Sequence, residues 1–124
     1  LIEMFLNNCS ADEAVGYSAP FSSEEYMQGA RQFPTLVPII PDNPAIPANR
    51  EAWSILEKFK KPFLTAFSDS DPVTKGGEAR FKDSVPGAAN QKHTIIKGAG
   101  HFLQDDASDE LSAIVIAFIK DNPL

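Results

Sequence analysis

The second half of the chain alternates between short apolar runs and segments whose apolar residues recur at helical spacing. The runs have the length of buried strands, and the spaced segments predict amphipathic helices. Strand, helix and strand in this order predict two parallel strands joined by a right-handed crossover. The predicted elements are a strand at 62–67, a helix at 76–85 that ends before Pro86, a strand at 93–97 and a helix at 107–120.

The first half predicts helices joined by proline-rich loops, because six of the ten prolines precede residue 60. Ser22 and Glu25 have the spacing of a capping box, which predicts a helix through about Gln32. Asn49 is the expected N-cap of a second helix. Residues 38–47 contain four prolines, so we expect no helix there.

The change in composition near residue 60 predicts two parts, 1–60 and 61–124. Two strands make a poor independent sheet, so the remaining strands are expected from elsewhere. Residues 1–6 have the pattern of the end of an amphipathic helix and begin without methionine. We therefore expect that residue 1 is not the biological start, and that a complementary N-terminal segment or chain completes the sheet.

Composition excludes several classes of function. The net charge of −6 disfavours nucleic acid or an anionic membrane as a partner, because no basic run exists to neutralise phosphates. The single cysteine, Cys9, cannot form an internal disulfide. No stretch approaches the roughly 18 apolar residues that a membrane helix needs. With no visible signal peptide, the expected compartment is the cytoplasm.

An acid and a histidine each follow one of the two predicted strands. Asp71 comes just after the first strand, and His101 follows the glycine-rich turn after the second. The carboxyl ends of parallel strands share one edge, where open α/β sheets place their sites. The two residues can therefore pair as base and orienting acid. Asp71 could instead merely start a turn, and Asp69 competes with it; His93, at a strand start, is expected to be structural.

Other chemistries have weak support in the sequence. Two histidines without a spaced cluster argue against a metal site. No convincing phosphate-binding glycine loop and no nucleophile elbow of the Gly-x-Ser-x-Gly type is present. The pair of Asp71 and His101 therefore lacks a convincing nucleophile within the chain.

At these residues the chain resembles the C-terminal part of a haloalkane dehalogenase, an α/β-hydrolase with a helical cap. The resemblance covers almost the whole chain and rests on residues 19–34, 67–72 and 98–102. The first stretch is the most specific, whereas the last is common to many α/β-hydrolases. The resemblance implies that 1–60 is the C-terminal part of the cap. Residues 61–124 would then be the C-terminal strand-helix-strand-helix part of an α/β core with parallel strands and flanking helices.

The resemblance also implies an activity, the hydrolysis of haloalkanes to an alcohol and halide through an alkyl-enzyme ester, without a cofactor. The partners would be a small apolar halogenated substrate, water and halide. His101 would be the base and Asp71 its orienting acid. The nucleophilic aspartate and the halide-binding tryptophans would lie before Leu1. The residues implied for the substrate and halide pocket are Phe33, Pro34 and Val37 from the cap, with Pro72, Val73 and Phe102 beside the triad.

Three alternatives remain open. An epoxide hydrolase of the same fold would need cap tyrosines, for which Tyr17 and Tyr26 are available. The Phe33-Pro34 stretch favours a dehalogenase. A serine esterase has less support. A catalytically incomplete fragment that needs a complementary chain is the alternative outside the enzymes, because an unpaired strand edge promotes association.

Overall fold

The computed structural model describes residues 7–123, and the chain divides into two compact units. One unit is Ser10–Ile55, and the other joins the described residues before Ser10 to the chain from Leu56 onward. The helix end expected at 1–6 lies outside the described residues. The assignment of 1–60 to a cap and of 61–124 to a core stays a prediction. Within residues 7–123, no helix is both long and apolar enough to cross a membrane.

The unit from Leu56 contains a parallel pair of strands, as the sequence predicted. Strand β1 (Ala66–Ser68) pairs with β2 (Thr94–Ile96), with Ala66 opposite Thr94 and Ser68 opposite Ile96. Helix α4 (Glu78–Ser84) forms the crossover and ends before Pro86. Both strands are shorter than their apolar runs. One reason is that Phe63 donates its N–H to the Gly87 carbonyl, outside the strand ladder.

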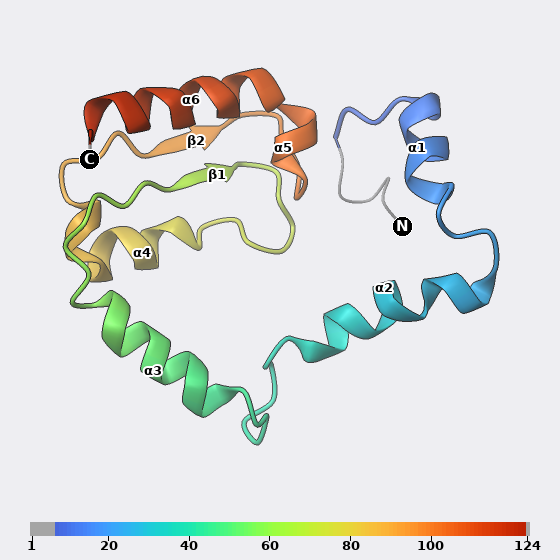
Figure 1. The fold of residues 1–124 in the computed structure, drawn as a ribbon, viewed down its shortest axis with the longest axis horizontal. Helices are drawn as coiled ribbons and strands as arrows, with labels where there is room; N and C mark the ends of the chain where they lie inside the picture. The colour runs from blue at the N-terminus through green and yellow to red at the C-terminus, as the bar shows by residue number, and fades with distance from the viewer. Residues whose placement is uncertain (1–6, 124) are drawn as a thin grey trace. The chain divides into compact units, whose positions relative to one another are not determined.

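Helices lie along both strands of this small sheet. Figure 1 shows α4 beside β1 and α6 (Ser108–Asp121) beside β2. On the α4 side, the Phe63 ring stacks on Phe81 with centroids 5.7 Å apart, and Phe67 lies 6.5 Å from the same ring. Ile96 of β2 is fully buried. A short helix, α5 (Leu103–Asp106), precedes α6 and was not predicted.

A tight turn after α4 depends on one glycine. In the 3₁₀ turn η4 (Pro86–Ala88), Gly87 donates its N–H to the Phe59 carbonyl at 2.8 Å. A β-carbon on Gly87 would collide with the carbonyl oxygen of Lys61. Gly87→Ala in the complete protein is therefore expected to lower the free energy of unfolding by about 1–3 kcal/mol, measured by urea denaturation.

Gly16→Ala provides the matched control for this substitution. Gly16 lies inside a helix, and nothing surrounds the place of its β-carbon within 4 Å. Alanine there should raise the free energy of unfolding by about 0.5–1 kcal/mol. A Gly87→Ala protein as stable as the unmodified one would contradict the close packing at this turn.

The unit Ser10–Ile55 corrects one predicted helix start. Ser10 and Glu13 form a capping box at α1 (Ala11–Ser18), with the Glu13 N–H donating to the Ser10 hydroxyl at 3.2 Å. The predicted box at Ser22 is wrong. The chain there forms a 3₁₀ turn, η2 (Glu24–Met27), after an extended Ser23, followed by α2 (Gln28–Gln32). The backbone bond from Tyr26 N–H to the Ser23 carbonyl closes that turn without a side-chain cap.

The second predicted helix start is also corrected. Helix α3 (Ile46–Leu56) begins three residues before Asn49 and includes Pro47, which the sequence had assigned to a non-helical stretch. Proline is tolerated in a first helical turn because the N–H it lacks would have no partner there. Asn43 instead accepts the backbone N–H of Ile46 on its carbonyl and that of Ala45 on its side chain. Between α2 and α3 lies the 3₁₀ turn η3 (Phe33–Leu36).

Candidate active site

The loops that follow β1 and β2 are joined by hydrogen bonds at the carboxyl edge of the sheet. Asp69 donates its backbone N–H to Ile96 at 3.1 Å, and Ser70 donates to Ala99 at 3.2 Å. The Asp69 carboxylate accepts the N–H of Gly98 at 2.9 Å. This bond is the largest cause that lowers the pKa of Asp69 below its usual value. Gly98 has a φ of +73°, which explains the glycine at this turn. Asp69, the other candidate for the orienting acid, therefore connects the two loops by hydrogen bonds.

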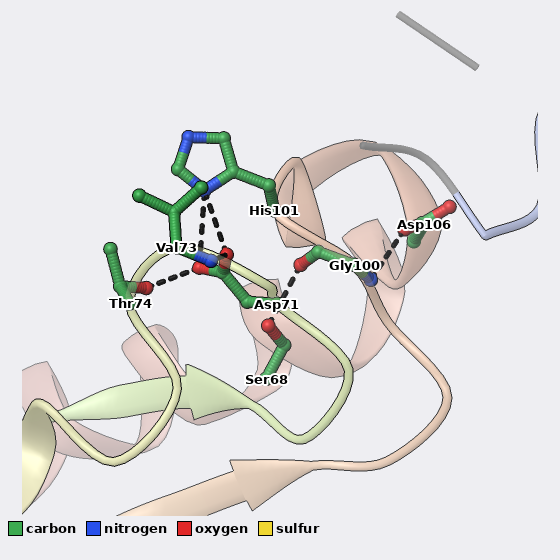
Figure 2. Close-up of polar contacts among 7 residues, drawn as sticks. All are labelled: Ser68, Asp71, Val73, Thr74, Gly100, His101 and Asp106. Carbon is green, nitrogen blue, oxygen red and sulfur yellow. Dashed lines mark hydrogen bonds and ion pairs between the residues drawn. The ribbon is translucent and has the colours of Figure 1, made fainter. Parts of the chain in front are cut away.

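The hydrogen bonds between the two loops place His101 beside Asp71. The Nδ1 atom of His101 lies 3.0 Å from one carboxylate oxygen of Asp71 and 3.1 Å from the other (Figure 2). The Asp71 side chain is only 3% exposed, whereas His101 is 33% exposed. An ionised carboxylate only accepts hydrogen bonds, so Nδ1 must carry the proton. That tautomer leaves Nε2 as the basic nitrogen of the ring.

The surroundings of Asp71 keep its carboxylate charged. Burial by itself raises the pKa of Asp71. Hydrogen bonds from the Thr74 hydroxyl, the Val73 N–H and His101 outweigh that effect and lower the pKa to about 2. The Val73 bond measures 2.7 Å, and Figure 2 shows all three donors around the carboxylate. Asp71 therefore does both things that the sequence left open, since it forms the turn and also pairs with the histidine.

The backbone next to His101 is held by side chains from two other segments. The Ser68 hydroxyl donates to the carbonyl of Gly100 at 2.7 Å, and the Gly100 N–H donates to Asp106 at 2.7 Å. The Phe102 ring meets the imidazole edge-on, with centroids 5.3 Å apart. Ser68, Thr74 and Asp106 were not among the residues predicted from the sequence. For Thr74 a local signal existed, because a hydroxyl three residues after an aspartate can bond that carboxylate.

The sequence of the chain is similar to part of several known enzymes. No protein-family model matches the chain. A haloalkane dehalogenase of Psychrobacter cryohalolentis is 52% identical over 107 residues, which cover 86% of this chain and 35% of that protein. The chain resembles the C-terminal third of haloalkane dehalogenases. The haloalkane dehalogenase of Mycobacterium marinum is 46% identical over 103 residues, 83% of this chain and 34% of its own length. The haloalkane dehalogenase of Sphingobium indicum is 28% identical over 121 residues, which cover 94% of this chain and 39% of that protein.

The resemblance predicted from the sequence is thus confirmed, and it concerns only part of each relative. The chain spans about a third of the length of these haloalkane dehalogenases. Such relatives imply an α/β-hydrolase fold, and the mixed helices with a small parallel sheet are compatible with its C-terminal part.

The residues expected to line a dehalogenase pocket fall in both units. Pro72 and Val73 follow Asp71 directly in the chain, and Val73 is 63% exposed. Phe102 contacts the imidazole. The three positions expected in a cap lie in the other unit, at the turn η3 and just after it. They are Phe33, Pro34 and Val37, all exposed. A common role of both groups in one pocket stays a prediction.

His93 makes structural contacts to the backbone, as expected from its place at the start of a strand. Its Nδ1 accepts the backbone N–H of Thr65 at 3.1 Å, and its Nε2 lies 2.8 Å from the Ala88 carbonyl oxygen. These contacts tie the start of β2 to neighbouring backbone, at the opposite end of the strand from the loop of His101. Within residues 7–123, no group of three or more acidic, histidine or cysteine side chains could hold a metal ion.

Proposed function

We propose that the complete protein carrying this chain hydrolyses haloalkanes to an alcohol and halide through an alkyl-enzyme ester. The observation that carries the proposal is the hydrogen bond from His101 Nδ1 to the buried Asp71 carboxylate. The pair lies on loops at the carboxyl edge of two parallel strands, where α/β enzymes place their chemistry. The names of the relatives support the same reaction.

The proposed roles follow from the chemistry of each group. A nucleophilic aspartate from outside residues 1–124 displaces halide from a saturated carbon and becomes an ester. Nε2 of His101 then takes a proton from water as the water oxygen attacks the ester carbonyl. The tetrahedral intermediate expels the alkoxide, which leaves as the alcohol after receiving that proton. The carboxylic acid thus freed on the aspartate loses its proton to solvent, and the carboxylate is ready for another substrate. Asp71 holds the imidazole in the required tautomer and offsets its positive charge.

The remaining expectations fit this scheme as parts of the same proposal. Residues 1–60 would be the C-terminal part of a cap and 61–124 the C-terminal part of an α/β-hydrolase core. The halide-binding tryptophans would come, like the nucleophile, from a complementary N-terminal segment or chain. The scheme uses no cofactor. The apolar side chains assigned to the pocket suit a small, uncharged halogenated substrate; they are Phe33, Pro34, Val37, Pro72, Val73 and Phe102.

The reaction class is tested by incubating the complete protein, as isolated, with 1-bromobutane. We expect bromide and 1-butanol to form in equal amounts over many turnovers, and none to form with heat-inactivated protein. A parallel assay with styrene oxide distinguishes a dehalogenase from an epoxide hydrolase. Its hydrolysis to the diol without any bromide release would replace the proposal with an epoxide hydrolase. If neither reaction occurs, the result supports a catalytically incomplete protein.

A further inference from the structure

The turn before His101 contains residues with high backbone flexibility. Gly98, Ala99 and Gly100 precede the histidine, and glycine has more backbone freedom than any other residue. The hydrogen bond to Asp71 requires that the imidazole be held near one position. Some other interaction must therefore restrict the backbone before His101.

The Gly100 peptide groups are fixed by two side chains from different segments. Its N–H donates to the Asp106 carboxylate, and its carbonyl accepts the hydroxyl of Ser68, each at 2.7 Å (Figure 2). Gly100 is buried and Ser68 is only 3% exposed. A hydrogen bond to an ionised carboxylate is stronger than one between neutral groups. The peptide on either side of Gly100 is thus anchored directly beside His101.

Asp106 also binds a distant part of the chain. Its carboxylate accepts the backbone N–H groups of Asn7 at 3.0 Å and Asn8 at 2.9 Å. The Asn7 side-chain amide donates to the carbonyl of Gly98, at the start of the same turn, at 3.2 Å. Burial raises the pKa of Asp106, but the three backbone N–H groups outweigh it and keep the pKa below its ordinary value. A single carboxylate therefore joins the histidine turn to the segment of Asn7 and Asn8.

We infer that Asp106, together with Ser68, is a positioning residue that fixes the backbone of His101 and thereby holds the imidazole against Asp71. Its effect on turnover rests on the proposed function, but its effect on the His101–Asp71 hydrogen bond does not. Displacing a reacting group by about 1 Å can slow a reaction by roughly 100-fold. Loosening this turn should therefore slow the step that uses His101 and spare the step that does not.

The kinetic test compares Asp106→Asn with Asp109→Asn in the complete protein. Asparagine keeps the size of the side chain, but its NH₂ group would face backbone N–H donors. With 1-bromobutane, we expect Asp106→Asn to retain a burst of one bromide per site and to show steady-state turnover roughly 10- to 100-fold slower. Asp109 is an exposed carboxyl in the first turn of α6, and Asp109→Asn should match the unmodified protein. A merely structural defect would reduce the burst and the steady state together.

The second readout needs no turnover, so it stands even if the proposed dehalogenation fails. The proton between His101 Nδ1 and Asp71 gives a downfield NMR signal, which should shift or broaden in Asp106→Asn and stay unchanged in Asp109→Asn. An unchanged signal in Asp106→Asn would overturn the inference. If Asp106→Asn does not fold, Ser68→Ala replaces it. A normal Nδ1 signal in Ser68→Ala would then overturn the inference, and an altered one would support it.

Discussion

His101→Ala in the complete protein is expected to release one halide per site and then to turn over only very slowly. Displacement of halide by the nucleophilic aspartate needs no base, whereas hydrolysis of the resulting ester needs His101 to accept a proton from water. General-base catalysis typically contributes roughly 10²–10⁴-fold, so the steady-state rate should fall by about that factor. Rapid-quench measurement of bromide from 1-bromobutane separates the burst from the steady state.

The other histidine of the chain provides the control for this result. His93 bonds to Thr65 and Ala88 near the start of β2, outside the candidate site. His93→Ala should lower stability, but its folded fraction should continue through many turnovers without a one-halide limit. Sustained turnover by His101→Ala at the unmodified rate would remove His101 from the mechanism.

Asp71→Asn is expected to slow turnover by roughly 10³–10⁴-fold, the scale of loss when a catalytic histidine is held in the wrong tautomer. The present carboxylate only accepts hydrogen bonds, which fixes the proton on Nδ1. An amide NH₂ at this place favours the opposite tautomer, in which Nε2 carries the proton and cannot act as a base. The substitution also removes the negative charge that balances the imidazolium. Steady-state kinetics with 1-bromobutane measures this loss.

Asp69→Asn is the matched comparison, because both acids follow β1 and differ in their partners. Asp69 accepts the N–H of Gly98, and an amide oxygen can still accept that bond. We expect Asp69→Asn to turn over at least about 100-fold faster than Asp71→Asn. If Asp69→Asn were the more severe of the two variants, the assignment of the orienting acid to Asp71 would be wrong.

The placement of Asp71 and His101 could be predicted because it depends on local patterns and one general rule. Each residue follows a short apolar run, and the order of elements requires the two runs to be parallel. The same reasoning placed His93 at the opposite end of its strand. The helix starts were less predictable. Three Ser-x-x-Glu patterns occur, at Ser10, Ser22 and Ser54. Only the first forms a capping box, and Ser54 lies inside α3.

Two of the supporting contacts could not be predicted because their partners are distant in the chain. Ser68 and Gly100 are 32 residues apart, and Asp106 bonds to Asn7, 99 residues away. No periodicity or local spacing encodes such contacts, which appear only when the two loops meet. The assignment of Phe33, Pro34 and Val37 to a pocket rests on resemblance to a family and not on a pattern in the sequence, and it stays a prediction.

The intact mass of the His101→Ala protein shows whether His101, oriented by Asp71, is the base that hydrolyses an alkyl-enzyme ester. After incubation of the complete variant with 1-bromobutane, we expect the protein to gain the mass of one butyl group, held on an acidic side chain. The unmodified protein should show no such accumulation under steady-state conditions. A His101→Ala protein that releases bromide at the unmodified rate and keeps its original mass would show that His101 is not the base.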